Sequence, residues 1–89
     1  MTEKELERKI ISRVRSEGGL CLKWVSPGYT GVPDRIVILP GGRIFFIEVK
    51  RPGRDNGLSP HQRRVIGRLR DLGCLVLVLN RLEDLDEYL

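Results

Sequence analysis

The chain has 89 residues, of which 40% are hydrophobic and 31% charged, and it carries a net charge of +4. This length excludes two separate hydrophobic cores, because a domain typically needs on the order of 100 residues, so we expect one domain over residues 1–89. No apolar run approaches the roughly 20 residues of a membrane-spanning helix, and the charged start MTEKELERKI is unlike a secretory signal, so we expect an intracellular protein that does not bind a membrane.

The first half of the chain predicts one helix and three strands. Thr2 followed by Glu5 resembles a capping box, and the apolar positions after it recur at helical spacing, so a helix should end before Gly18-Gly19. The apolar segment 20–25, LCLKWV, predicts a strand, and the Pro- and Gly-rich loop SPGYTGVP should end it. Segments 34–39 and 43–50 are apolar on both faces and separated by PGG, which predicts an antiparallel hairpin in a sheet covered on both sides.

The second half predicts a helix, a strand and a final short helix. Ser59, Pro60 and Gln62 provide the capping signals of a helix that ends at Gly73. Its predicted buried stripe consists of Val65, Ile66, Leu69 and Leu72. Segment 74–80 predicts a buried strand, and segment 82–89 a short helix with leucines on one side. We therefore expect an α/β fold in the order α-β-β-β-α-β-α, with a mixed sheet flanked by helices, because a strand-helix-strand passage normally gives parallel strands.

Charge and cysteine content indicate the partner and the compartment. Between residues 50 and 70 the chain has seven basic side chains and one acidic side chain, Asp55. In the last nine residues, acidic side chains outnumber basic ones. A basic loop and helix favour binding to a polyanion such as nucleic acid, although a solvated helix face is an equally good interpretation of charge alone. The basic residues are Lys50, Arg51, Arg54, Arg63, Arg64, Arg68 and Arg70. Cys21 and Cys74 lie in apolar runs, which predicts buried thiols in a reducing compartment and no zinc site.

Glu48 and Lys50 interrupt the apolar pattern of segment 43–50. Side chains alternate along a strand, so these two share a face with Ile44 and Phe46. A buried carboxylate is costly unless it is paired or binds a metal. The pair Glu-x-Lys alone favours a simple ion pair at a strand end.

Asp34 opens the strand that forms the hairpin with the Glu48 strand. The start of one hairpin strand lies beside the end of the other, so Asp34 and Glu48 should converge. Two adjacent carboxylates raise each other's pKa unless a cation neutralises them, and hard oxygen ligands suit Mg²⁺, which keeps waters and binds substrate phosphate. For Asp34 alone, a turn residue that bonds its own backbone is the favoured alternative.

Two further polar residues lie on predicted buried faces. Glu7 falls within the apolar arc of the first helix, where the alternative is an acid favoured by the helix dipole. Gln62 lies on the sheet-facing side of its helix, where it can both cap Ser59 and contact a site. Ser26 and Tyr29, in the preceding Gly-rich loop, are candidates for contacts to backbone phosphates.

Asp34 followed by Glu48, Val49 and Lys50 is similar to the PD-(D/E)xK nuclease motif, and Pro33 supplies its proline. The segments GVPDR, FIEVKRPG and LSPHQ, in this order and spacing, resemble the VRR-Nuc (virus-type replication-repair nuclease) domain, and closely its stand-alone phage form. The resemblance covers nearly the whole chain except the final acidic helix.

This resemblance implies a restriction-endonuclease-like core with a divalent metal site. Asp34 and Glu48 would hold Mg²⁺, for which Mn²⁺ would substitute, helped by the backbone carbonyl of Val49. Lys50 would orient or polarise the attacking water. No organic cofactor is expected.

The resemblance also implies roles for residues around the metal and a class of substrate. Gln62 and Glu7 would support the metal and its water. Stand-alone members act as homodimers on branched DNA such as Holliday junctions, which implies a DNA-repair endonuclease in the cytoplasm of a bacterium or a phage-infected cell. A flap-directed or nonspecific nuclease and a catalytically silent DNA-binding module are the alternatives. The predicted contacts to DNA phosphates come from Arg51, Arg54, Arg63, Arg64 and Arg68.

Overall fold

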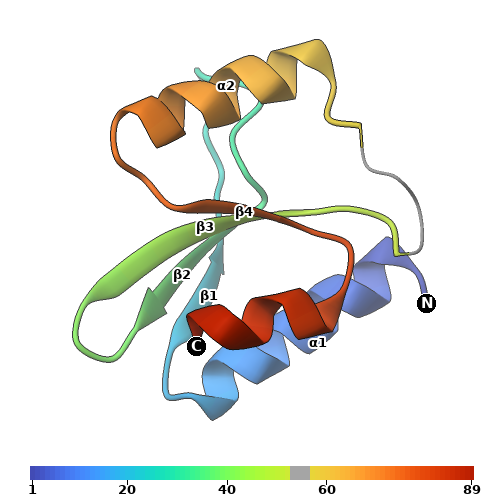
Figure 1. Ribbon diagram of the computed structural model, residues 1–89, viewed down its shortest axis with the longest axis vertical. Helices are drawn as coiled ribbons and strands as arrows, with labels where there is room; N and C mark the ends of the chain where they lie inside the picture. Colours follow the sequence, from blue (N-terminus) through green and yellow to red (C-terminus); the bar gives the residue numbers. More distant parts are fainter. Residues whose placement is uncertain (53–56) are drawn as a thin grey trace.

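The helices and strands lie where the sequence predicts them, with differences at the ends of some elements. The computed structural model describes residues 1–52 and 57–89, so Arg54 lies outside the described residues. In chain order the elements are α1 (Glu3–Ser16), β1 (Leu20–Lys23), β2 (Arg35–Leu39), β3 (Arg43–Val49), α2 (Pro60–Asp71), β4 (Val76–Leu79) and the 3₁₀ helix η1 (Leu82–Tyr88) (Figure 1).

The strands form one mixed four-stranded sheet in the order β1-β2-β3-β4. β1 pairs antiparallel with β2, and β2 with β3, whereas β4 lies parallel to β3 after the chain has crossed over through α2. The hairpin between β2 and β3 turns through Gly41 and Gly42, whose φ angles of 87° and 78° fall in the left-handed region that favours glycine. The predicted mixed sheet is confirmed.

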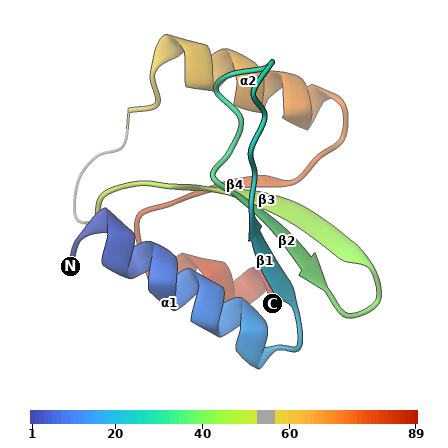
Figure 2. The same cartoon turned by 180° about the vertical axis from the view of Figure 1, so that it is seen from behind.

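Helices lie on both faces of the sheet. α1 and η1 run side by side over one face, and α2 lies over the other (Figures 1 and 2). The main core is on the α1 side, where Ile10, Val14, Val37, Ile47 and Leu85 are fully buried. Cys21 belongs to this core and Cys74 is half-buried, and both thiols are free. Burial raises the pKa of the Cys21 thiol, which keeps it in the neutral form.

The α2 side of the sheet is less completely covered. Val65 and Ile66 of α2 are buried as predicted, but Leu72, at the C-terminal cap of the helix, is 63% exposed. The prediction that Leu72 is buried was wrong, because this side chain lines an open hollow between α2 and the loop that joins β1 to β2. Leu20, Leu22 and Ile44 also remain exposed.

Two elements differ from their predicted form. β1 ends at Lys23 and not at residue 25, although the Trp24 amide still donates to the Asp34 carbonyl at 3.0 Å. The final helix is 3₁₀ and not α. Its apolar residues Leu82, Leu85 and Tyr88 recur every three positions, and a 3₁₀ helix places residues at that spacing on one side.

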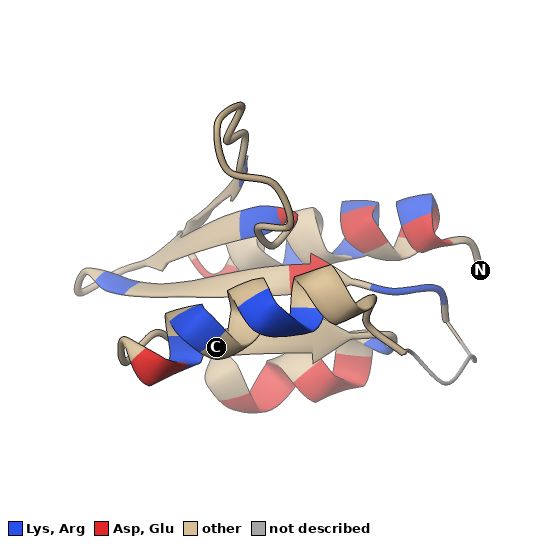
Figure 3. Ribbon diagram, turned by 90° about the horizontal axis from the view of Figure 1, so that it is seen from above, with Lys and Arg blue, Asp and Glu red and all other residues tan. Residues whose placement is uncertain are grey.

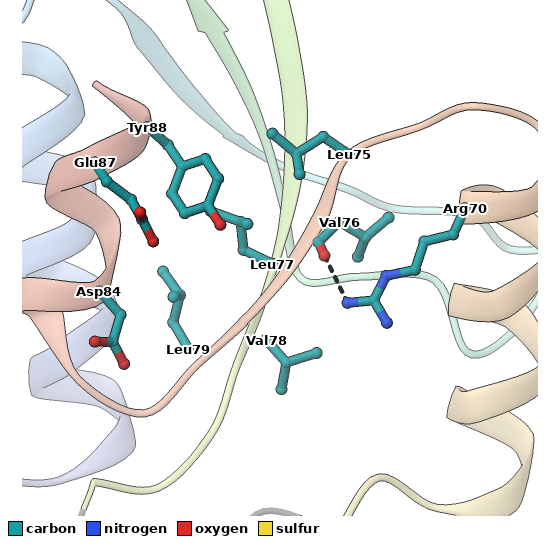
Figure 4. Close-up of a pocket in the computed structure, with 9 residues that line it drawn as sticks. All are labelled: Arg70, Leu75, Val76, Leu77, Val78, Leu79, Asp84, Glu87 and Tyr88. Atoms are coloured by element: carbon teal, nitrogen blue, oxygen red, sulfur yellow. Dashed lines mark hydrogen bonds between the residues drawn. The ribbon is translucent and has the colours of Figure 1, made fainter.

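β4 forms one edge of the sheet, and a hollow of about 420 Å³ lies along it. Arg70 donates to the Val76 carbonyl at 2.7 Å and so occupies part of the open edge, while Asp84 and Glu87 approach from η1 (Figure 4). These acids make the hollow unsuited to a polyanion. In the described part of the chain, neither α helix nor η1 has the length and apolar character of a membrane span.

Candidate active site

The hairpin brings the carboxyl groups of Asp34 and Glu48 together. Arg35 pairs with Ile47, and this register, continued by one residue, places Asp34 opposite Glu48 at the end of β3. The Val49 amide donates to Asp34 Oδ2 at 2.8 Å, which holds the Asp34 side chain at this end of the sheet. Glu48 is only 5% exposed and is the only buried charged residue in the described parts of the chain. The predicted convergence of the two carboxylates is confirmed.

Lys50 and Gln62 complete a connected polar group around Glu48. Lys50 Nζ lies 3.3 Å from Glu48 Oε2, so the ion pair favoured by Glu-x-Lys alone is present. Lys50 also donates to Gln62 Oε1 at 3.0 Å, and Gln62 Nε2 donates to Glu48 Oε2 at 2.9 Å. Three side chains from β3, the residue after it and α2 are thus joined in one network, which we call the Glu48 network.

The start of α2 determines how Gln62 enters this network. Ser59 Oγ accepts from the Gln62 amide at 3.1 Å, and the Ser59 amide donates to Gln62 Oε1 at 3.1 Å, which forms the predicted capping box. Oε1 accepts from both Ser59 and Lys50, so the side-chain NH₂ group is the part that remains to face Glu48. Capping and contact with the site coexist, as the sequence predicts.

The electrostatics of the site disfavour a second negative charge. Burial and the nearby Asp34 carboxylate raise the pKa of Glu48 from 4.5 to about 7, although Lys50 acts in the opposite direction. Near neutral pH, Glu48 therefore holds a proton in a large fraction of metal-free molecules. A cation bound between the carboxylates would favour the ionised form.

The donor set fits a hard divalent cation such as Mg²⁺. Asp34 and Glu48 supply two carboxylates, and residues 1–52 and 57–89 contain no cluster of three or more acidic, histidine or cysteine side chains. Mg²⁺ is usually held by one or two carboxylates and keeps several waters, so two ligands leave positions for water and phosphate. Metal binding and the role of the Val49 carbonyl stay predictions.

Glu7 pairs with Arg35, the residue after Asp34, which the sequence did not single out; the predicted role of Glu7 beside the metal stays a prediction. Arg35 Nε donates to Glu7 Oε2 at 2.7 Å, and both side chains are partly buried. Arg35 follows Asp34, so strand alternation turns it to the opposite face, toward α1. A charged residue on that face needs a partner, and this signal could have predicted the pair with Glu7.

The predicted DNA contacts fall mainly on α2. Arg63, Arg64 and Arg68 are exposed on this helix and Arg51 is exposed just after β3, whereas the acids of η1 lie on the other side (Figure 3). Arg70, in contrast, is engaged by the β4 edge.

The loop between β1 and β2, which contains Ser26 and Tyr29, runs beside α2 (Figures 1 and 2). His61 at the start of α2 holds it there, since its Nε2 lies 2.9 Å from Thr30 Oγ1 and 3.0 Å from the Thr30 carbonyl oxygen. Gly31 is required at this contact, because a Cβ atom would lie 2.7 Å from the His61 ring. This anchor was not predicted, since its only signal in the sequence is a glycine in a loop that is rich in glycine.

Two carboxylates and a lysine lie at the strand ends of a mixed sheet, and the helix over them supplies a glutamine. This is the arrangement expected of the predicted class of nuclease domains. The chain matches the family model of the VRR-NUC domain over residues 1–81 and therefore belongs to this family of nuclease domains. A phage protein described as "Putative nuclease p44", from Acyrthosiphon pisum secondary endosymbiont phage 1, is 46% identical over 87 residues, which span 98% of this chain and 90% of that protein.

The structural comparison agrees with the family assignment. A solved structure described as "VRR_NUC domain" has a TM-score of 0.88 and 34% sequence identity, and the match covers 98% of this chain and 94% of the other. These matches confirm the predicted family and α/β fold.

Proposed function

We propose that this protein is a Mg²⁺-dependent endonuclease that hydrolyses DNA phosphodiester bonds in a structure-directed way, most effectively in branched DNA such as four-way junctions. The observation that carries the proposal is the Glu48 network beside Asp34, at the end of the sheet from which the basic helix α2 starts. Membership of the VRR-NUC family supports the same activity.

The side chains divide the chemistry between them. Asp34 and Glu48 would hold the metal, and the metal would supply Lewis-acid chemistry for the scissile phosphate and the attacking water. Lys50 orients the attacking water, because its ammonium group is held by Gln62 and Glu48. Gln62 keeps the Glu48 carboxylate in place by its hydrogen bond.

The direct test is incubation with labelled four-way, flap and linear duplex DNA, with Mg²⁺, Mn²⁺ or EDTA. We expect cleavage with either metal, none in EDTA, and the fastest cleavage on the four-way junction. Paired nicks at symmetrical positions would support two active sites acting on one junction. Faster cleavage of the flap would make a flap, and not a four-way junction, the preferred substrate. Equal cleavage of all three DNAs would contradict structure-directed activity.

Arg63 and Arg64 are expected to contribute to affinity through contacts with phosphates, and not through sequence recognition. Both are exposed on α2, near the Gln62 end of the helix. Replacing both by glutamine should weaken binding and reduce the slope of log affinity against log salt by about 2, because each neutralised phosphate releases about one counterion. Fluorescence anisotropy with labelled DNA at several salt concentrations measures this slope.

Arg81 provides the matched control for this experiment. It is an exposed arginine at the start of η1, where its neighbours include the acid Glu83. Arg81→Gln should leave the slope unchanged. If the affinity of the wild-type protein for DNA does not vary with salt, electrostatic binding of DNA phosphates by α2 is contradicted.

We also propose that the protein acts as a homodimer. Leu20, Leu22 and Ile44 are 55%, 45% and 56% exposed, and strand alternation places them on the sheet face that α2 only partly covers. A two-fold interface brings the same patch of each copy together, and an uncharged apolar patch can pack against itself without repulsion between like charges.

The mass in solution tests this assembly. For the wild type, light scattering should give twice the 10.2 kDa mass of the chain. For the double variant Leu22→Ser, Ile44→Ser it should give the mass of a single chain. Leu75→Ser is the control, since Leu75 is also exposed but lies at the β4 edge. A wild-type protein that remains a monomer of 10.2 kDa at high concentration would contradict the homodimer.

A further inference from the structure

A second hollow, of about 270 Å³, lies between α2 and the loop that joins β1 to β2. Its lining is mainly apolar and aromatic, with one cation: Trp24, Tyr29, Val65, Leu69, Leu72 and Arg68. This volume is below the roughly 300–1,000 Å³ of pockets for drug-sized ligands, so the hollow suits a single ring system. We call it the Trp24 pocket.

The Trp24 pocket is a direct neighbour of the carboxylates. The Trp24 amide bonds to the Asp34 carbonyl, and Asp34 in turn lies opposite Glu48, so the three residues form one row across three adjacent strands. Neighbouring strands are about 4.8 Å apart, which places Trp24 within about 10 Å of Glu48. A ligand that spans from the site to the pocket is therefore of the size of one to three nucleotides, since stacked nucleotides rise about 3.4 Å each.

The walls of the pocket are held in place. The ring of Trp24 packs on Phe46 with centroids 4.9 Å apart, and Phe46 precedes Glu48 by two residues on the same strand. The opposite wall is the β1–β2 loop, which His61 ties to α2 through Thr30. Tyr29 on this loop is nevertheless 57% exposed, and Leu72 is 63% exposed. The pocket is thus preformed, open to solvent and only partly filled by the protein itself.

We propose that the Trp24 pocket receives an unpaired nucleobase of the DNA substrate, next to the bond that is cut. This inference rests on the proposed nuclease function and adds the feature of the DNA that the site selects. Aromatic side chains stack on bases of any sequence, and the Arg68 guanidinium at the pocket can meet the adjoining phosphate or stack on the base. Single-stranded segments supply bases that are already unpaired, and the base pairs at a branch point border an interruption of the duplex, whereas a continuous duplex must first be opened at a cost of a few kcal/mol.

The fluorescence of Trp24 reports directly on this proposal, because it is the only tryptophan in the chain. The Glu48→Gln protein is titrated in EDTA, so that no DNA is cut, with a ten-residue deoxythymidine strand, an abasic strand of equal length and charge, and a ten-base-pair duplex. We expect strong quenching by the thymidine strand and little quenching by the duplex or the abasic strand. Equal quenching by the abasic strand would overturn the proposal.

The variant Tyr29→Ala tests the pocket independently of the fluorophore. Loss of one stacking contact should weaken binding of the thymidine strand about tenfold and leave duplex binding within about twofold. Val25→Ala is the control, since Val25 is exposed beside Trp24 but does not line the pocket, and it should change neither affinity. Unchanged single-strand affinity of Tyr29→Ala would contradict the inference.

The same variants distinguish a base from a second copy of the chain as the occupant. If Tyr29→Ala halves the mass measured by light scattering, the pocket belongs to a protein interface and the proposal fails. Failure of the nuclease assignment is separate, because it would appear as intact DNA in the presence of Mg²⁺, whereas quenching and affinity are measured without metal and without cleavage.

Discussion

Replacing Glu48 by glutamine is expected to lower the rate of DNA cleavage by at least about 10³-fold while leaving the affinity for DNA within about threefold. The variant keeps the size of the side chain and its hydrogen bond with Gln62 but removes the charge, and a metal ligand lost at a phosphoryl centre costs several kcal/mol of transition-state stabilisation. Single-turnover cleavage of a labelled four-way junction with saturating protein measures the rate, and anisotropy measures the affinity.

Glu83→Gln is the matched control, because Glu83 is an exposed acid of η1 on the far side of the sheet. It should cleave at the wild-type rate. A Glu48→Gln protein that cuts as fast as the wild type would remove Glu48 from the active site. If the wild type is folded and binds DNA but cuts no substrate with any metal, the catalytically silent DNA-binding module becomes the better description.

Most of the fold could be predicted because local signals and the hydrophobic pattern agree. Capping residues at Thr2 and Ser59 mark the starts of both α helices, and the turn at Gly41-Gly42 determines the hairpin. The failures occur where long-range geometry decides. The sequence does not show that Leu72 lines an open hollow, and a short apolar repeat cannot distinguish a 3₁₀ helix from an α helix until its neighbours are placed.

The candidate site, like the fold, could be predicted only in part. The convergence of Asp34 and Glu48 could be predicted, because a hairpin with a known turn has a known register. The pair of Glu7 with Arg35 could have been predicted from strand alternation. The anchoring of the β1–β2 loop by His61 could not, because it joins residues 31 positions apart without a local signal. The orientation of the Gln62 amide likewise depends on two donors that meet its oxygen only in the folded protein.

A second large effect is expected from Glu48, on how the stability of the fold depends on pH. The unfolded carboxyl group loses its proton near pH 4.5, whereas the folded one keeps it until about pH 7. Between these values the native state binds more protons than the unfolded state, so Glu48 lowers the free energy of unfolding as pH rises. The difference corresponds to roughly 3 kcal/mol between pH 4.5 and pH 7, which is a large part of the 5–15 kcal/mol that small domains typically have.

Urea unfolding in EDTA at pH 5 and pH 8 measures this effect as a difference between wild type and Glu48→Gln. Groups remote from Glu48 titrate alike in both proteins, so the wild type should lose roughly 2 to 3 kcal/mol relative to the variant at the higher pH. Adding Mg²⁺ at pH 8 should return much of this stability to the wild type and little to the variant, since a ligand that binds only the native state stabilises it. A wild type that gains stability relative to Glu48→Gln at pH 8 without metal would show that Lys50 outweighs burial and the Asp34 charge at this site.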